Sequence, residues 1–431
     1  MSTTEYVETV IIGAGQQGCG VAASLQDLDR PCLVLERGEI GQAWAHERWD
    51  NLLVGSGNRS VRFPGWDYPD RDPSGTLSGP ELAGHLRRYA AERGLPVRQH
   101  TPVERVECPP GAATDAAVRF RTRLSTGDVV ESRNLVAAVG GYAAPHTPAL
   151  AGDLDPAVHQ LHSHAYRNPA ALPEGAVLVV GAGISGQQIA DELADAGRRV
   201  FLSVGRHRAW PRRYRGRGLH EWIFALGLYG DFVTQNTGGP DVLPGLPVTA
   251  VTDGGDLNLG TLARKGVTLV GSARAAERHA LVLADNVLAV AERSARAYQR
   301  VIDTIDAGIR RRGFAVPEQR PAPGVDLADL RDFGTRLDLT EHAITTVLWC
   351  TGFGPDYGVL PAAALDERGA PVHEKGLLGA LPGLYYAGLP DGDSLAPVAI
   401  AANVDNGRFI AHQVHVDHLL RTGSTESVIV L

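Results

Sequence analysis

The chain has 431 residues, of which 44% are apolar and 21% charged, and its formal net charge is −8. This length predicts two or three folding units, and the negative charge argues against a general affinity for nucleic acid or anionic membranes. No apolar run approaches the roughly 18 to 20 residues of a membrane-spanning helix, and the first ten residues carry no basic region. We therefore expect a cytoplasmic protein. The four cysteines, Cys19, Cys32, Cys108 and Cys350, have neither the number nor the spacing of a disulfide framework or a zinc site.

The chain opens with a predicted strand–helix–strand unit, and a second such unit begins 168 residues later, counted from Gly13 to Gly181. The first unit has apolar strands at 6–12 and 31–35 around a helix at 18–28, and the second has strands at 176–180 and 200–204 around a helix at 187–195. This is an internal repeat of one supersecondary motif, and not a short-period solenoid.

The segments between and after the two units predict further elements. Helices are expected at 81–93 and 285–312, the latter as one long helix or two, and strands at 98–108, 117–124 and 134–139. Apolar strands at 346–350 and 383–389 are expected to complete the sheet begun at the N-terminus. Pro- and Gly-rich stretches at 143–156 and 316–324 are the natural linkers.

The first glycine motif reads Gly13-x-Gly15-x-x-Gly18, and Glu36 ends the following strand. Glycine permits the tight turn, the close approach of a pyrophosphate and the packing of helix on strand, while the helix N-terminus attracts phosphate. A carboxylate at Glu36 can accept hydrogen bonds from both hydroxyls of an adenosine ribose. The motif therefore predicts a dinucleotide site; a glycine-rich turn of structural use is the alternative.

The second motif, Gly181-x-Gly183-x-Ser185-Gly186, has the same frame, but Arg206 stands where the first has a carboxylate. A cation at this position suits the 2′-phosphate of NADPH. Six arginines crowd twelve residues here, namely Arg206, Arg208, Arg212, Arg213, Arg215 and Arg217. The alternative is that they form a solvated basic loop or a nucleic-acid patch.

Two such sites in one chain predict FAD and NADPH together, with electrons passing from the nicotinamide to the flavin and on to an acceptor. Cys19 and Cys32 are 13 positions apart, on the first helix and the next strand, and offer no redox pair. Oxygen is the remaining common acceptor.

The chain resembles the class B flavin-dependent monooxygenases: flavin-containing monooxygenases, plant auxin-forming enzymes and their Baeyer–Villiger relatives. The residues that carry the resemblance are the GGxW-like run at 38–44, the W-D-x-L-like run at 49–52, Phe63-Pro64-Gly65 with Tyr68-Pro69, Val139-Gly140-Gly141-Tyr142, and Trp349-Cys350-Thr351-Gly352-Phe353. Beside the glycines and Glu36, the resemblance implies cofactor-binding roles for Gln17, Arg37, Gln42, Trp44, Gly140, Thr351, Gly352, Ser185, Arg206 and Arg208.

The family fingerprint between the two glycine motifs, F-x-G-x-x-x-H-x-x-x-(Y or W), is half present. His162 and Tyr166 match its second half, whereas Pro156 and Val158 replace the phenylalanine and glycine. Tyrosine at 166 favours oxygenation of a heteroatom over Baeyer–Villiger chemistry. His162 has the alternative of an ordinary linker histidine.

The resemblance implies an α/β fold of two Rossmann-like domains, with the FAD domain at 1–160 and 341–431 and the NADPH domain inserted at 161–340. A helical region at 219–314 would build the substrate pocket. No catalytic residue is identified; Asn58, Asp393 and Asn403 are the candidates, with ordinary surface roles as the alternative. We expect no metal, and the partners to be O2 and a small organic molecule, with a homodimer left open.

The implied activity is the insertion of one oxygen atom through a flavin (hydro)peroxide, at nitrogen or sulfur. The alternatives are Baeyer–Villiger oxidation or oxidative decarboxylation of a 2-oxo acid, an NADPH oxidase or flavin reductase, and a non-enzymatic nucleotide-binding subunit. Intact glycines in both motifs argue against the last.

Overall fold

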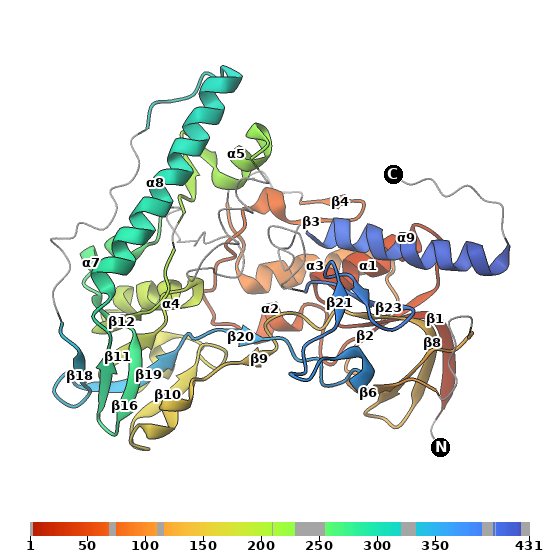
Figure 1. Ribbon diagram of the computed structural model, residues 1–431, viewed down its shortest axis with the longest axis horizontal. Coiled ribbons are helices and arrows are strands. Elements are labelled where there is room, and N and C mark those ends of the chain that lie inside the picture. Colours follow the sequence, from red (N-terminus) through yellow and green to blue (C-terminus); the bar gives the residue numbers. More distant parts are fainter. Residues whose placement is uncertain are drawn as a thin grey trace.

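The computed structural model describes residues 3–68, 75–109, 116–208, 210–228, 255–319, 333–389, 400 and 402–423. Two sheets, one at each side of the view in Figure 1, are each covered by helices. The predicted α/β class with two Rossmann-like units is confirmed. No helix among the described residues is long and apolar enough to cross a membrane.

The first sheet has nine strands in the described part of the chain, and its central part is parallel. The central strand β1 (Thr4–Ile12) lies between β2 (Cys32–Leu35) and β8 (Val129–Ala137). Next to β2 lies β5 (Val97–Arg98), and next to β8 lie, in order, β23 (Leu384–Tyr386), β22 (Leu378–Gly379) and β21 (His373–Glu374). A hairpin of β6 (Val103–Glu107) and β7 (Phe120–Leu124) is attached to β8 through β7. The C-terminal half of β1 is buried on both faces, which is why it reads as a continuous apolar run.

Three helices pack on one face of this sheet: α1 (Gln16–Gln26), α3 (Gly79–Arg93) and α9 (Ala402–Thr422). A capping box between Ser78 and Glu81 begins α3, and Gly94, at φ +60°, ends it. Glycines at 20 and 407 let α1 and α9 approach closely, because a Cβ on either would lie within 3 Å of the other helix. Near its C-terminal end, α9 is held by Asp417, which accepts hydrogen bonds from the buried guanidinium groups of Arg119 and Arg133.

The second sheet is parallel throughout and has the order β10 (His159–His162), β19 (Ile344–Trp349), β11 (Ala176–Val180), β12 (Val200–Val204) and β15 (Thr268–Gly271). The expectation that strand 346–350 completes the N-terminal sheet is wrong, because β19 pairs with β10 and β11. The expectation for 383–389 is confirmed, since β23 pairs with β8.

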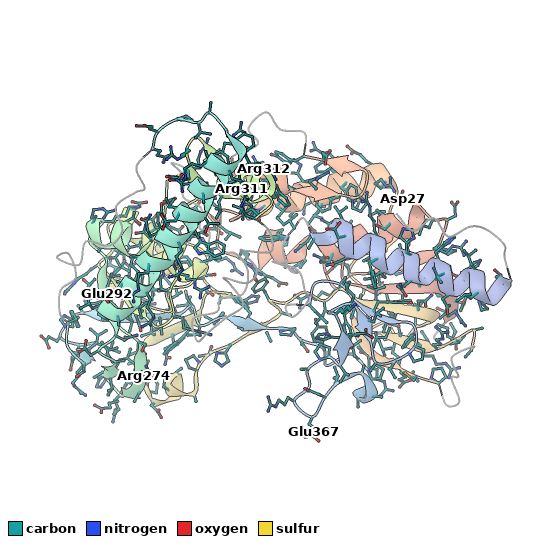
Figure 2. All side chains as sticks on the ribbon, turned by 45° about the horizontal axis from the view of Figure 1, so that its top comes forward. Asp27, Arg274, Glu292, Arg311, Arg312 and Glu367 are labelled. Atoms are coloured by element: carbon teal, nitrogen blue, oxygen red, sulfur yellow. The ribbon has the colours of Figure 1, made fainter. Side chains whose placement is uncertain are left out.

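Helices α4 (Ile184–Asp195), α5 (Leu219–Leu226), α7 (Leu259–Arg264) and α8 (Val287–Arg312) accompany the second sheet. The segment 285–312 forms one helix, not two, and it ends at Gly313, at φ +67°. Arg310, Arg311 and Arg312 occupy its last turn, as the helix dipole favours, and Glu292 lies near the opposite end (Figure 2). The region 219–314 was expected to be helical, but it also contains strands. Within it, β15 joins the second sheet, and β16 (Ala273–Glu277) pairs with β17 (Ala280–Leu283), which also pairs with β18 (Arg336–Asp338).

Short elements complete the described chain. They are α2 (Gln42–His46), the hairpins of β3 (Arg62–Phe63) with β4 (Trp66–Asp67) and of β13 (Arg213–Tyr214) with β14 (Arg217–Gly218), and the 3-10 turns η1 (Asn58–Ser60), η2 (Ala149–Asp153), η3 (Pro169–Ala171) and η5 (Ala362–Ala364). The two chain segments that run between the sheets pair with each other through β9 (Ala144–Pro145) and β20 (Phe353–Gly354), in the middle of Figure 1.

Candidate functional site

The first glycine motif forms the turn between β1 and α1, and each glycine has a distinct steric role. Gly13 is at φ +106°, and a Cβ there would lie 2.5 Å from the carbonyl oxygen of Ala138. A Cβ on Gly18 would lie 1.9 Å from the carbonyl oxygen of Gly13, so helix and turn touch at this point. A Cβ on Gly15 would meet no atom within 4 Å. The first and third glycines therefore serve packing, whereas the second leaves the N-terminus of α1 open to a ligand.

Glu36 lies beside this turn, at the end of β2, and is buried. Its Oε2 accepts a hydrogen bond from the Ala14 N–H at 2.7 Å, and its Oε1 accepts one from the Gly38 N–H at 2.9 Å. Each carboxylate oxygen can accept a further bond. The side chain is thus held in place by backbone and keeps acceptor capacity for a pair of hydroxyl groups.

The second motif repeats this geometry between β11 and α4. Gly181 is at φ +110°, and a Cβ there would lie 2.5 Å from the carbonyl oxygen of Cys350. A Cβ on Gly186 would lie 1.8 Å from the carbonyl oxygen of Gly181. A Cβ on Gly183 would again meet nothing within 4 Å. Ser185 lies half-buried in the first turn of α4. The two turns therefore have the same shape, and each leaves its middle glycine open.

The residues after β12 differ in character from those after β2. Arg206 is exposed and Arg208 is half-buried, so arginines follow β12 where the carboxylate of Glu36 follows β2. Between them lies His207, which is buried and donates its Nδ1 hydrogen to the carbonyl oxygen of Ala182, at 3.0 Å. Burial lowers the pKa of His207 to about 4, so the ring is neutral at neutral pH. Sequence reasoning missed His207, since only the fold shows that it closes on the glycine turn.

Two other residues with implied cofactor roles, Trp44 and Gln17, lie at the first turn of α1. The Trp44 indole N–H donates to Gln16 Oε1 at 3.0 Å, and Gln17 Oε1 accepts from Asn406 Nδ2 of α9 at 3.0 Å. Gln42 begins α2 after Gly41, and its Oε1 accepts from the Glu39 N–H at 3.3 Å. Arg37 points outward and forms an ion pair with Glu47.

The two crossing segments are bonded to each other around Gly352. Gly140 is at φ +84° and Gly352 at φ +96°, which only glycine adopts freely. The His146 N–H donates to the Gly352 carbonyl oxygen at 3.0 Å, and the Thr351 hydroxyl donates to the His146 carbonyl oxygen. Thr351 and Gly352 thus hold the two crossings in register.

His162 is fixed to the second crossing by both ring nitrogens. Its Nδ1 accepts from the His164 N–H at 3.1 Å, which leaves the hydrogen on Nε2, and Nε2 donates to the Gly352 carbonyl oxygen at 3.0 Å. The ring lies edge-on to Phe353, with centroids 4.8 Å apart, and burial lowers its pKa. Both ring nitrogens of His162 are thus occupied by backbone groups, which gives the side chain a structural role at the crossing.

Comparison with known proteins shows which proteins this chain is similar to. Residues 10–216 match the model of the pyridine nucleotide-disulphide oxidoreductase family. This segment of the chain is therefore similar to that family. An uncharacterized oxidoreductase, CzcO-like, of Geobacillus kaustophilus is 28% identical over 387 residues, 89% of this chain and 91% of that protein. The indole-3-pyruvate monooxygenase YUCCA1 of Oryza sativa subsp. japonica is 33% identical over 197 residues, 45% of this chain and 47% of that one.

Solved structures of this oxidoreductase type share the fold of the whole chain. A flavin-containing monooxygenase from Stenotrophomonas maltophilia has a TM-score of 0.66 at 20% identity, covering 96% of this chain and 99% of its own. A closed cyclohexanone monooxygenase has a TM-score of 0.53 at 18% identity, covering 97% and 85%. A third structure, a complex of OTEMO with FAD and NADP, has a TM-score of 0.53 at 16% identity, covering 97% and 86%. The predicted resemblance to flavin-containing and Baeyer–Villiger monooxygenases is confirmed at the level of fold.

The family name includes disulphide chemistry, which the cysteines of this oxidoreductase do not support. All four cysteines are free. Cys19 is buried in α1 and Cys32 half-buried in β2, and burial raises the pKa of each thiol to about 12. Neither thiol ionises at neutral pH, so neither is activated for the thiol–disulfide exchange through which a cysteine pair takes part in flavin redox chemistry.

The three candidate catalytic residues lie in different settings. Asn58 is buried in η1. Asn403 is completely buried in the first turn of α9, where its Nδ2 donates to the Arg62 carbonyl oxygen at 2.6 Å and its side chain packs against Gly20. Asp393 falls outside the described residues. Asn403 therefore joins α9 to α1 and β3, and Asn58 stays a candidate.

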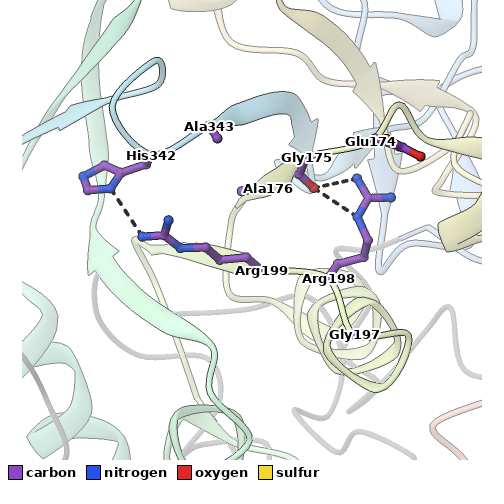
Figure 3. Close-up of a pocket in the computed structure, with 8 residues that line it drawn as sticks. All are labelled: Glu174, Gly175, Ala176, Gly197, Arg198, Arg199, His342 and Ala343. Atoms are coloured by element: carbon purple, nitrogen blue, oxygen red, sulfur yellow. Dashed lines mark hydrogen bonds between the residues drawn. The ribbon is translucent and has the colours of Figure 1, made fainter.

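A separate cavity lies at the opposite edge of the second sheet, where β11, β12 and β19 begin (Figure 3). Arg198 donates there to the Gly175 carbonyl oxygen, and Arg199 donates to His342 Nδ1 at 3.4 Å. Nucleotides bind at the carboxyl edge of parallel strands, so this cavity is not part of the candidate site. Among the described residues, no group of three or more His, Cys, Asp or Glu side chains could hold a metal ion.

Proposed function

We propose that the chain is an FAD- and NADPH-dependent monooxygenase that inserts one atom of O2 into a small organic molecule, at nitrogen or sulfur. The observation that carries the proposal is the pair of matched glycine turns, one beside the carboxylate of Glu36 and the other followed by Arg206. We assign FAD to the nine-stranded sheet and NADPH to the five-stranded sheet.

The residues present fit these two cofactors. At each turn the open middle glycine, Gly15 or Gly183, gives a pyrophosphate access to a helix N-terminus. Glu36 would accept the hydrogen bonds of the adenosine ribose of FAD, and Arg206 would pair with the 2′-phosphate of NADPH. Bound FAD supplies the chemistry of accepting hydride and activating oxygen; the protein binds, orients and excludes water.

The residues between the two turns are suited to positioning and not to proton transfer. Both nitrogens of His162 are engaged with backbone groups, so its hydrogen is committed to Gly352. Phe353 and Tyr142 stack edge-on beside it, with centroids 5.9 Å apart. Arg48 lies over both rings, and this hydrogen-bonded crossing helps to keep the two sheets in register.

The proposal is tested by measuring whether NADPH oxidation is coupled to oxygenation of an organic substrate. We expect the purified protein to be yellow, to release FAD on denaturation, and to oxidise NADPH with equimolar formation of an oxygenated product from at least one member of a panel of amines, sulfides, ketones and 2-oxo acids. Formation of one hydrogen peroxide per NADPH consumed, with every compound of the panel, would favour an NADPH oxidase. A colourless protein that takes up no FAD would favour a non-enzymatic subunit.

A second candidate is oxidative decarboxylation of a 2-oxo acid. It is supported by the 33% identity to an indole-3-pyruvate monooxygenase over 197 residues. Release of CO2 from a 2-oxo acid, stoichiometric with NADPH, would select it over oxygenation of nitrogen or sulfur.

A further inference from the structure

A short segment of the N-terminal half, residues 49–55, is built into the second half of the molecule; we call it the strap. Trp49 and Leu52 are buried in the same apolar cluster as Val179 of the second sheet, Ile189 of its helix α4, and Tyr166, which follows β10. The strap follows α2 and leads to η1, which carries Asn58. It therefore connects the flavin side of the proposed site with the NADPH side through a shared core.

Hydrogen bonds fasten the strap along its length. The Asp50 N–H donates to the Arg167 carbonyl oxygen at 2.8 Å, and Gln188 Nε2 of α4 donates to the Leu53 carbonyl oxygen at 3.1 Å. Further along, Arg212 Nη1 donates to the Gly55 carbonyl oxygen at 3.2 Å. These three bonds engage the backbone of the strap, so they depend little on its side chains.

Two further contacts depend on side chains on both sides. Asn168 Nδ2 donates to Asp50 Oδ2 at 2.7 Å, and the other contact is centred on Glu192 of α4. Asn51 Nδ2 donates to Glu192 Oε1 at 2.8 Å, and the Tyr166 hydroxyl donates to Glu192 Oε2 at 3.0 Å. Tyr166 is completely buried. Burial raises the pKa of Glu192, and the hydrogen bonds from Asn51 and Tyr166 act in the opposite direction. A half-buried carboxylate needs such donors to remain ionised.

We propose that Asn51, Tyr166 and Glu192 form a latch that fixes the strap to α4 and so sets the position of the second glycine turn against the flavin side of the site. The inference rests on the proposed function for its consequence, hydride transfer from NADPH to FAD. The helix α4 begins at the turn that would hold the pyrophosphate and carries Glu192 two turns later, so a rigid helix connects the latch to the nucleotide. The three are positioning residues.

The test exchanges the hydrogen-bond donor at residue 51 and the acceptor at residue 192. Asn51→Asp places a second carboxylate against Glu192, and the two charges repel in a half-buried setting. Adding Glu192→Gln restores the contact with its direction reversed, because the introduced amide N–H donates to the introduced carboxylate while the amide oxygen accepts from Tyr166. Gln299→Glu is the matched control, since it places a carboxylate beside Asp303 on the exposed face of α8.

Two readouts are needed. Hydrogen–deuterium exchange of peptides covering 46–55 reports the latch without any turnover, and stopped-flow reduction of bound FAD by NADPH reports its consequence. We expect N51D to accelerate exchange in the strap and to slow reduction on the order of tenfold to a hundredfold, with FAD content and the Kd for NADPH within about twofold of the unmodified protein. The N51D/E192Q protein should recover both, and Q299E should change neither.

The outcomes separate the latch from the proposed function. If exchange in N51D equals that of the unmodified protein, or if N51D/E192Q is no better than N51D, the latch is wrong. If NADPH fails to reduce the unmodified protein while exchange follows the expected pattern, the latch stands and the proposed function is wrong. Weakened NADPH binding with an unchanged reduction rate at saturation would overturn the positioning role.

Discussion

At the scale of single residues, glycines that look alike in the sequence differ in what they do. Gly15 and Gly183 are open, whereas Gly18 and Gly186 each abut the carbonyl oxygen of the glycine that begins their turn. The spacing alone predicted the two turns and the different steric roles of their glycines. It could not predict His207 against Ala182, because that contact joins residues 25 positions apart and depends on the packing of β12 beside β11.

This difference gives a prediction for the first turn. Gly15→Ala should fold with an unchanged melting temperature and bind FAD more weakly, since its methyl group enters only the space left for the pyrophosphate. Gly18→Ala should lose about 1–3 kcal/mol of folding free energy, because its methyl group must displace backbone. Thermal unfolding of the apoproteins and FAD titration distinguish the two. Equal stability of both variants would contradict the packing role of Gly18.

Arg206 gives the second residue-scale prediction. Losing a charge-assisted bond to phosphate costs about 1.5–3 kcal/mol, or roughly tenfold to a hundredfold in affinity. Arg206→Ala should therefore raise the Kd for NADPH by that factor and leave the Kd for NADH nearly unchanged, as measured by titration of the oxidised protein. The exposed Arg213 supplies the matched control, Arg213→Ala. Equal losses for NADPH and NADH would show that Arg206 does not contact the 2′-phosphate.

At the scale of elements, local patterns predicted most helices and strands but not every partner. The strands 176–180 and 200–204 were predicted to the residue, because fully buried parallel strands are unbroken apolar runs. The strand at 346–350 was placed in the wrong sheet, since a short apolar run carries no signal of which neighbour it will pair with. The same holds for the strap, whose Trp49 and Leu52 pack into a sheet that begins more than 100 residues later.

The link between β12 and the second glycine turn makes folding stability depend on pH. In the folded protein the pKa of His207 is lowered from 6.5 to about 4, by burial. The contribution of neutral His207 to the free energy of unfolding is therefore complete above pH 6.5. It is lost as pH falls from 6.5 toward 4, because the unfolded chain binds the proton more readily than the folded protein does. Between pH 7.5 and pH 5 this one residue should remove about 2 kcal/mol.

His207→Asn keeps a donor for the Ala182 carbonyl oxygen but cannot titrate. Denaturant unfolding of both proteins at pH 7.5 and pH 5 should show a smaller loss of stability for the variant. The pH dependence of stability that remains in the variant includes the contribution of His220. Burial and the positive charge of Arg212 lower the pKa of His220 to about 4 as well. An identical loss in both proteins would mean that His207 is already accessible to water in the folded state.

At the scale of the whole molecule, the two nucleotide-binding units are joined at the paired crossings and at the strap. The sequence motifs indicated where the crossings lie, through Gly140 and Gly352, but not that β9 and β20 pair with each other. Gly352 is the centre of this region, because its carbonyl oxygen accepts hydrogen bonds from both His146 and His162. Its conformation, at φ +96°, is one that a β-branched residue does not adopt without strain.

Gly352→Val should therefore loosen the register of the two units without touching either nucleotide turn. A Cβ at this position meets no atom within 4 Å, so the cost arises from the backbone and not from a clash. The rotated peptide would release His146 and His162, and water would enter between the sheets more often. With a substrate present, we expect the share of consumed NADPH that ends as hydrogen peroxide to rise several-fold, while the rate of NADPH oxidation changes less.

Gly369→Val is the control for backbone strain alone, because Gly369 is also at positive φ with open space around it but lies in a turn between Asp366 and Ala370. Peroxide release and NADPH oxidation are measured in parallel on both variants, with FAD content as the check on folding. If G369V releases as much peroxide as G352V, general destabilisation explains the effect. If G352V slows NADPH oxidation more than it raises the peroxide share, the crossing controls the approach of the two cofactors and not the exclusion of water.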